Sequence, residues 1–247
     1  MLYHKIRNKN TIFYFGHRGA PNLYLENSIQ SITQSINLGC NGVELDIQLT
    51  NDNQIILFHD SFITLDGKKY IINRLSYLQL IELCDQNNHP VPDLFINLIP
   101  TIINHPNIVF NIEIKSNRLN NYKILSYLLN HLPKNILINQ CIISSFNFFL
   151  LYQLRFLFFY KGPIAIILAN TNFTNKFFIQ LYKMIIYILN PAFIHLDIHC
   201  VTQSIVDWIH SQSKILNVYT INHSHELEKC IQMGVDGIFT DNHNFYA

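Results

Sequence analysis

Charged residues are scarce in this chain of 247 residues, where Asp, Glu, Lys and Arg make up 13%. That share is about half of what soluble proteins usually carry. A nucleic-acid binder needs clustered Lys and Arg, so a formal net charge of +1 predicts no nucleic-acid partner. The apolar share is 49%, which excludes intrinsic disorder and predicts a large hydrophobic core.

Apolar runs of membrane-spanning length are also missing, although the mean hydropathy is +0.14. The most apolar stretch, residues 146–169, is interrupted by charges at Arg155 and Lys161. A second stretch, residues 177–189, carries Lys183 and is shorter than the roughly 20 residues of a spanning helix. We therefore expect both stretches to form buried core, and no transmembrane segment.

Paired cysteines are absent as well. The five cysteines are widely spaced, form no C-x-x-C pair and predict buried free thiols: Cys40, Cys84, Cys141, Cys200 and Cys230. A disulfide framework or a thiolate zinc site is not expected from this pattern. Residues 1–10 lack the apolar run of a secretory signal peptide and are interpreted as an N-terminal extension, so a cytoplasmic location is expected.

Short β-branched or aromatic runs alternate with longer amphipathic runs along the chain. The strand-like runs are Thr11–Phe15, Gly42–Leu49, Ile108–Ile114, Gln140–Ser144, Ile164–Leu168, Phe193–Leu196, Ile215–Thr220 and Gly237–Phe239. The helix-like runs include Glu26–Leu38, Asn121–His131, Phe146–Phe156, Thr174–Tyr187, Thr202–Ser211 and Ser224–Met233. This alternation favours a parallel α/β fold, and eight strands predict a (β/α)8 TIM barrel, with a doubly wound open sheet as the alternative.

One segment breaks the alternation, between the second and third barrel strands. It contains a further strand-like run at Gln54–Phe58, a loop around Asp66 and Gly67, and a helix-like run at Leu75–Leu83. We interpret it as a hairpin extension followed by a short excursion over one end of the barrel.

Acidic residues fall on two neighbouring predicted strands. Glu44 and Asp46 are two positions apart in one strand, so both carboxylates face the same side, and Glu113 lies near the end of the next strand. Three converging carboxylates repel one another unless a cation lies among them. Because all ligands are oxygen atoms, a hard ion, Mg²⁺ or Ca²⁺, is expected.

Basic residues and histidines lie at the same strand ends. Arg18 and Lys115 supply positive charge suited to a phosphate group, and His17 and His59 titrate near neutral pH. A cation, two basic side chains and two histidines together indicate phosphodiester cleavage, in which one histidine acts as base and the other as acid.

These residues lie in six blocks that resemble those of a known family. Each block alone is unspecific, but their order along the chain matches that of glycerophosphodiester phosphodiesterases: His17-Arg18-Gly19-Ala20, Glu26-Asn27-Ser28, Gly42-Val43-Glu44-Leu45-Asp46, His59-Asp60, Asn111-Ile112-Glu113-Ile114-Lys115 and Gly234-Val235-Asp236-Gly237-Ile238-Phe239-Thr240-Asp241. The resemblance implies a TIM-barrel catalytic domain over residues 11–247. It also implies a divalent cation and hydrolysis of a small-molecule glycerophosphodiester to glycerol 3-phosphate and an alcohol.

The resemblance also implies a role for each site residue. Glu44, Asp46 and Glu113 would bind the metal. His17 and His59 would be the catalytic pair, and Arg18 and Lys115 would hold the phosphate. Where the family usually has Trp, this chain has Tyr219, which keeps a ring against the substrate but changes its shape. Residues 61–67 are short compared with the family, which predicts a more open rim.

Other polar residues near the blocks have local interpretations. Glu26, Asn27 and Ser28 precede a helix and fit either a cap or the site. Asp60 is expected to orient His59. Residues 145–147 are expected to cap a helix. Four histidines are expected at the polar surface or at satisfied, partly buried positions: His195, His199, His223 and His225. Asp241 is expected to be a turn and helix-cap residue after the last strand.

Two other functions are compatible with the sequence. One is a phospholipase D-like member of the same superfamily acting on lysophospholipid or sphingomyelin, and the other is a non-catalytic barrel that binds a ligand. The sequence leaves open the head group, Mg²⁺ or Ca²⁺, the acid and base roles of the histidines, a cyclic phosphate intermediate and the oligomeric state.

Overall fold

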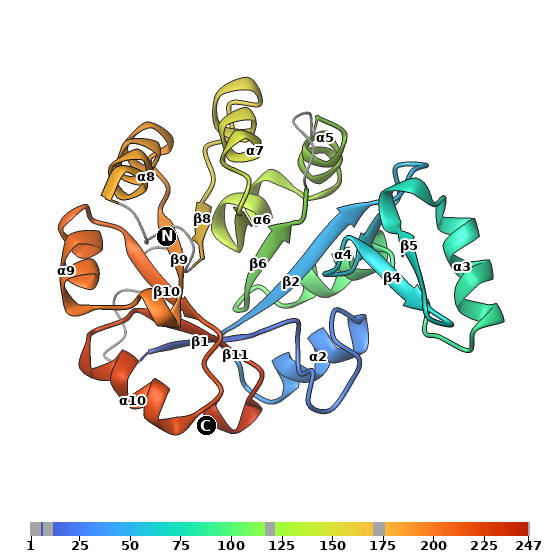
Figure 1. Ribbon diagram of the computed structural model, residues 1–247, viewed down its shortest axis with the longest axis horizontal. Helices are drawn as coiled ribbons and strands as arrows, with labels where there is room; N and C mark the ends of the chain where they lie inside the picture. Colours follow the sequence, from blue (N-terminus) through green and yellow to red (C-terminus); the bar gives the residue numbers. More distant parts are fainter. Residues whose placement is uncertain (1–5, 7–11, 117–121, 170–175, 247) are drawn as a thin grey trace.

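The computed structural model describes residues 6, 12–116, 122–169 and 176–246, with only the backbone described for 176–179. Eight parallel strands form a closed barrel (Figure 1), because β1 pairs with both β2 and β11. These strands are β1 (Phe13–Gly16), β2 (Gly42–Leu49), β6 (Val109–Ile114), β7 (Cys141–Ser145), β8 (Ile164–Leu168), β9 (Phe193–Asp197), β10 (Ile215–Tyr219) and β11 (Gly237–Thr240). The predicted TIM barrel is confirmed, and closure excludes the open sheet.

Helices surround this barrel on the outside (Figure 1). They are α2 (Ile29–Asn37), α4 (Phe95–Asn104), α5 (Tyr122–His131), α6 (Lys134–Asn139), α7 (Phe148–Tyr152) with the π-helical turn η2 (Gln153–Leu157), α8 (Lys176–Leu189), α9 (Gln203–Ser211) and α10 (Ser224–Gln232); short 3-10 turns are η4 (Ile198–Cys200) and η5 (His243–Phe245). The sequence analysis did not predict α4, which contains Pro100, or the short α6. Within the described residues, no helix is long and apolar enough to cross a membrane.

The barrel interior is apolar at one end and polar at the other. Buried side chains fill the end where the strands begin, among them Ile6, Phe13, Phe15, Val109, Phe193 and Phe239. Apart from Ile6, which packs into this cluster, the predicted extension 1–10 lies outside the described residues. All five cysteines are buried and free, as predicted. The polar side chains gather toward the ends of the strands.

The excursion between β2 and β6 is built on an antiparallel hairpin. Strand β3 (Ile55–Leu57) pairs antiparallel with the outer half of β2, and β4 (Phe62–Leu65) pairs with β5 (Lys68–Ile71). The turn η1 (Ile72–Arg74) and helix α3 (Tyr77–Gln86) follow, and a small apolar cluster holds these elements together. The expected loop at Asp66 and Gly67 is thus the turn of a second hairpin, whose two strands were not predicted.

The two most apolar stretches are buried only in part, and the expectation of buried core was wrong for the outer faces of their helices. Strand β8 is entirely buried inside the barrel wall. Helix α7, the turn η2 and helix α8, in contrast, leave large apolar side chains exposed, including Phe149, Phe156 and Tyr187. The inner faces of these helices are core, as expected, with Leu150, Leu154 and Leu189 buried. Among the described residues, nothing covers their outer faces, so the expectation failed only there.

Candidate active site

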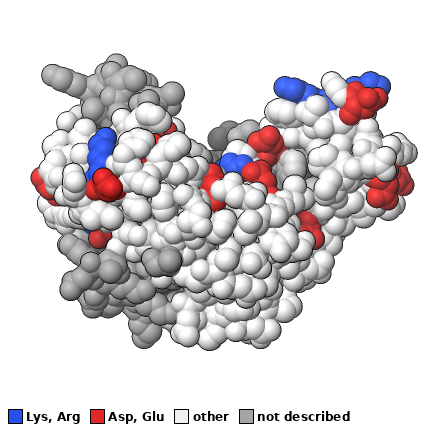
Figure 2. Space-filling view, turned by 90° about the horizontal axis from the view of Figure 1, so that it is seen from below, with Lys and Arg blue, Asp and Glu red and all other residues white. Residues whose placement is uncertain are grey.

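The candidate active site lies at the C-terminal rim of the barrel. Figure 2 shows a hollow between the barrel and the excursion, with acidic and basic side chains at its base. Seven of the eight residues predicted from sequence line one cavity of about 220 Å³: His17, Arg18, Glu44, His59, Glu113, Lys115 and Tyr219. The eighth, Asp46, contacts Lys115 with an oxygen to nitrogen distance of 3.0 Å. The structure therefore brings the whole predicted set together.

The three carboxylates come from two adjacent parallel strands. Asp46 on β2 is the direct neighbour of Glu113 on β6, and Glu44 lies two residues earlier on the same face of β2. One oxygen from each carboxylate lies within 4.8 Å of the others, and all three side chains are buried. This arrangement concentrates up to three negative charges at buried positions beside the inner cavity.

The pKa values of the three carboxyl groups reflect this crowding. Burial, together with the charges of Asp46 and Glu113, raises the pKa of Glu44 well above its usual value. Burial and the charge of Asp46 raise the pKa of Glu113 to about 7. Burial acts in the same direction on Asp46, but Lys115, His59 and Arg18 hold its pKa below the usual value. Burial and mutual repulsion thus oppose ionisation of Glu44 and Glu113, whereas the nearby basic groups favour ionisation of Asp46.

This donor set fits a divalent cation. Glu44, Asp46 and Glu113 form a group that could hold a metal ion. All donors are carboxylate oxygens, which match the preference of Mg²⁺ and Ca²⁺ over softer metals. A bound cation would also offset the mutual repulsion that raises the pKa of two of the three groups.

The two basic side chains are held in place by the acidic ones. Lys115 contacts both Asp46 and Glu113 through its ammonium group. The backbone N–H of Arg18 donates to Glu44 at 2.8 Å, and its guanidinium donates to both oxygens of Glu26 at 2.9 and 3.0 Å. Both basic side chains are therefore fixed beside the carboxylates.

The segment before α2 serves both the helix and the site. Ser28 caps α2 by accepting a hydrogen bond from the backbone N–H of Ser31 at 3.0 Å. The side chain of Asn27 donates to Asp46 at 2.8 Å and accepts from the backbone N–H of Asp46 at 2.9 Å. Ser28 is therefore the cap, whereas Asn27 orients a carboxylate and Glu26 orients Arg18.

The tight turn after β1 depends on Gly19, and its replacement by Ala should destabilise the protein. Gly19 has a φ of 90°, and an added Cβ would lie 2.5 Å from Oγ and 2.6 Å from the carbonyl carbon of Ser31. We expect Gly19→Ala to lower the free energy of unfolding by at least about 2 kcal/mol in urea denaturation.

Gly39→Ala is the matched control, because Gly39 also has a positive φ of 95° but its Cβ would meet no atom within 4 Å. It should cost only about 1 kcal/mol from backbone strain. Equal losses in the two variants would contradict the close packing of the turn after β1 against α2.

Each predicted catalytic histidine is hydrogen-bonded to a carboxylate. Nδ1 of His17 lies 2.8 Å from Asp241, and Nδ1 of His59 lies 2.7 Å from Asp60. A carboxylate accepts the Nδ1 proton, which leaves Nε2 of each ring for proton exchange. Burial lowers the pKa of His59, although Asp46 opposes this effect. Asp60 orients His59 as predicted.

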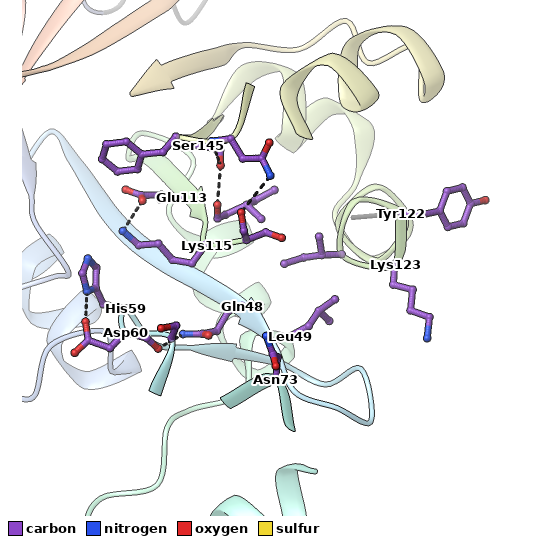
Figure 3. Close-up of a pocket in the computed structure, with 16 residues that line it drawn as sticks. Gln48, Leu49, His59, Asp60, Asn73, Glu113, Lys115, Tyr122, Lys123 and Ser145 are labelled. Atoms are coloured by element: carbon purple, nitrogen blue, oxygen red, sulfur yellow. Dashed lines mark hydrogen bonds and ion pairs between the residues drawn. The ribbon is translucent and has the colours of Figure 1, made fainter. Parts of the chain in front are cut away.

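A second, outer cavity of about 530 Å³ adjoins the inner one and shares four lining residues with it: His59, Glu113, Lys115 and Phe146. Figure 3 shows Lys115 reaching toward Glu113 at one side of this cavity and Tyr122 pointing away from it. Tyr219 lines the inner cavity, and its position is fixed by two contacts: its hydroxyl donates to the carbonyl of Leu168 at 2.9 Å, and its ring meets Phe146 edge-on. The carboxylate group thus lies where two spaces meet.

Comparison with known proteins is consistent with this geometry. The model of the glycerophosphoryl diester phosphodiesterase family matches residues 17–244. The chain belongs to this family. It is 27% identical over 234 residues to a glycerophosphodiester phosphodiesterase of Caldanaerobacter subterraneus, covering 91% of this chain and 92% of that protein. It is 23% identical to one from Bacillus altitudinis, covering 92% and 93%.

Solved structures share the fold of this family member. A phosphodiesterase of Oleispira antarctica in complex with the product sn-glycerol-3-phosphate superposes with a TM-score of 0.77 at 20% identity, covering 93% of this chain and 92% of that one. A glycerophosphodiester phosphodiesterase of Thermotoga maritima gives 0.75 at 21% identity, covering 96% and 97%. At such identities the likeness concerns the barrel.

Two residues of the candidate site were not predicted from the sequence. Asp241 was expected to form a turn, but it bonds to His17 and also accepts from Asn222 at 2.6 Å. His195 was expected at the surface or with a partner. It is buried and lines the inner cavity, and its Nε2 has no hydrogen-bond partner among the described residues. The only sequence signal was its spacing of two residues from Phe193 in β9, which puts both side chains on the face that points into the barrel.

Proposed function

We propose that this member of the phosphodiesterase family hydrolyses glycerophosphodiesters to sn-glycerol 3-phosphate and an alcohol. The observation that supports this most strongly is the buried group of Glu44, Asp46 and Glu113, flanked by two carboxylate-bound histidines. The Oleispira antarctica relative, solved with sn-glycerol-3-phosphate, supports the same substrate class. We assign the activity to residues 11–247, with 1–10 as an extension.

The proposed mechanism divides the work among the residues of the rim. Glu44, Asp46 and Glu113 would hold a divalent cation, which when bound polarises the phosphate and stabilises its developing charge. Arg18 and Lys115 would bind the phosphate oxygens and orient the diester. Asp241 and Asp60 hold the imidazole rings of His17 and His59 in position.

Proton transfer is assigned to the two histidines. One would accept a proton from the attacking hydroxyl or water through Nε2, and the other would protonate the leaving alcohol. His17 lines only the inner cavity, whereas His59 lines both cavities and so reaches groups on either side of the phosphate. Tyr219 would pack its ring against the substrate.

Removal of divalent cations tests the metal site. Excess EDTA should abolish release of sn-glycerol 3-phosphate from glycerophosphocholine, because the three carboxylates would then repel one another and leave the phosphate without a counterion. Adding Mg²⁺ or Ca²⁺ back should restore turnover. The measurement is a coupled assay of glycerol 3-phosphate in each metal in turn.

Two results would contradict these assignments separately. Turnover unaffected by EDTA would show that the carboxylate group does not hold an essential metal. Cleavage of lysophosphatidylcholine without cleavage of glycerophosphocholine would instead favour the phospholipase D-like alternative. For the two choline lipids the measured product is choline, since phospholipase D-like cleavage of lysophosphatidylcholine or sphingomyelin releases choline and no glycerol 3-phosphate.

A further inference from the structure

One third of the chain carries no negative side chain. Residues 114–196 contain none of the 16 acidic residues but eight of the 17 basic ones: Lys115, Arg118, Lys123, Lys134, Arg155, Lys161, Lys176 and Lys183. This span forms α5, α6, α7, η2 and α8 together with β7 and β8. Figure 1 shows α5, α7 and α8 on one side of the barrel. Lys115 belongs to the rim site, and the side chains of Arg118 and Lys176 lie outside the described ones. The positive charge described on this side therefore comes from Lys123, Lys134, Arg155, Lys161 and Lys183.

Exposed apolar side chains gather on the same side. Among the described residues, ten of the 17 large apolar side chains that are exposed belong to this span. We define the aromatic flank as six of them: Phe149, Tyr152, Phe156, Phe159, Tyr187 and Ile188. Tyr187 is 84% and Phe159 is 72% exposed, so these rings project into solvent. Soluble monomers rarely leave such a concentration uncovered unless it binds something.

Four of the six residues of the aromatic flank are linked by ring contacts or by a shared groove. Along α7 and η2 the ring of Tyr152 is stacked with that of Phe149, with 6.3 Å between ring centroids, and its centroid lies 4.8 Å from that of Phe156. Phe156 and Ile188 line one surface groove of about 620 Å³, which joins η2 to the end of α8. The flank therefore extends over two neighbouring helices.

Basic groups line the same groove. Arg155 and Lys161 are both among its lining residues, and no acidic residue is. The guanidinium of Arg155 donates to the carbonyls of Tyr160 at 2.7 Å and Gly162 at 3.3 Å, so it is held at this position. Lys161 is exposed. Apolar rings and fixed positive charge thus lie side by side.

We propose that the aromatic flank docks on the surface of a membrane that contains anionic lipids. Tyr side chains favour the boundary between lipid headgroups and acyl chains, because they offer an apolar ring with a polar hydroxyl, and the Phe and Ile side chains can enter the acyl region. Each Lys or Arg near an anionic surface adds about 1 kcal/mol of attraction. The docked enzyme would lie where deacylation of phospholipids releases glycerophosphodiesters.

A second copy of this chain is a poorer occupant of the flank. A two-fold dimer would place the same surface against itself, so Arg155 and Lys161 would face their own copies across a groove that no acidic residue lines. Anionic lipid headgroups supply the missing negative charge, and the acyl boundary accepts the rings. Charge complementarity therefore favours the membrane.

Binding to lipid vesicles tests this docking surface. Wild-type protein should co-sediment with vesicles of phosphatidylcholine containing about 30% phosphatidylglycerol, bind neutral phosphatidylcholine vesicles at least fivefold less, and dissociate as salt rises. The double variant Phe159→Asn, Tyr187→Ser should lower the bound fraction at least fivefold. Asn suits position 159 because Phe159 has a φ of 52°.

Matched variants separate this proposal from loss of folding. Lys161→Glu changes only charge and should weaken binding to anionic vesicles. Leu78→Ser and Ile231→Ser remove exposed apolar side chains elsewhere and should bind like wild type. All variants should cleave soluble glycerophosphocholine normally and melt near the wild-type temperature.

Several results would overturn the proposal. These are no binding to anionic vesicles, equal binding to neutral ones, or unchanged binding of the double variant and Lys161→Glu. Light scattering that shows a wild-type dimer, converted to a monomer by the double variant, would instead assign the flank to a second copy of the chain. Loss of glycerophosphodiester turnover alone would bear on the active site and not on the flank.

Discussion

Replacing His17 by Ala should lower kcat/KM for glycerophosphocholine by about 10²–10⁴-fold, the usual contribution of a general acid or base. His17 lines the inner cavity, and its Nδ1 is held by Asp241 at 2.8 Å, so Nε2 is the nitrogen free to move a proton. Folding should change little, because the side chain is partly exposed at the rim. Steady-state kinetics and thermal melting of the purified variant measure both effects.

The supporting carboxylate provides a graded comparison. Asp241→Asn keeps the shape of the side chain but removes the charge that orients and stabilises the ring of His17, so a smaller loss and a shifted pH profile are expected. His225→Ala, at an exposed position on α10, should leave kcat/KM unchanged. If His17→Ala retained wild-type turnover, its catalytic role would be refuted.

Glu44→Gln should lower turnover by at least about 100-fold, equivalent to the loss of about 3 kcal/mol of transition-state stabilisation. Gln preserves the size of the side chain, and its carbonyl can still accept the backbone N–H of Arg18, which donates to Glu44 at 2.8 Å. The substitution therefore removes a negative charge from the carboxylate group and leaves the local backbone supported. Metal-dependent turnover with increasing Mg²⁺ measures the loss.

Glu44→Gln should not destabilise the protein, in contrast to its effect on turnover. In buffer with EDTA the melting temperature should stay unchanged or rise, because the substitution relieves repulsion among three buried carboxylates. Glu228→Gln, at an exposed position on α10, is the control for loss of one negative charge and should affect neither property. A large fall in melting temperature under these conditions would mean that Glu44 supports the fold and not a metal.

Local patterns predicted much of the barrel and its acidic group. Alternating apolar runs identified all eight barrel strands, since a buried parallel strand is apolar over its length. A spacing of two residues placed Glu44 and Asp46 on one face of β2, and the same spacing relates Glu113 to Lys115. Such spacings depend only on residues close together in the sequence, so they predict strands and their faces without knowledge of the tertiary structure.

The partners of the histidines could not be predicted in this way. His17 and Asp241 are 224 residues apart and meet only because the barrel closes between β1 and β11. His59 reaches the rim because β3 runs antiparallel to β2, with Leu57 beside Ile47, and so returns the chain to the site. Pairing across the sheet fixed both positions.

The sequence by itself determined the fold class, the family resemblance and the residues that carry charge into one rim. Tertiary structure decided which apolar residues are covered, since hydrophobicity does not reveal whether another layer packs on a helix. Residues 146–169 illustrate this, with β8 buried in the barrel wall and Phe149 and Phe156 of the preceding helix exposed. Burial depends on contacts between distant segments, and these exist only once the barrel has closed.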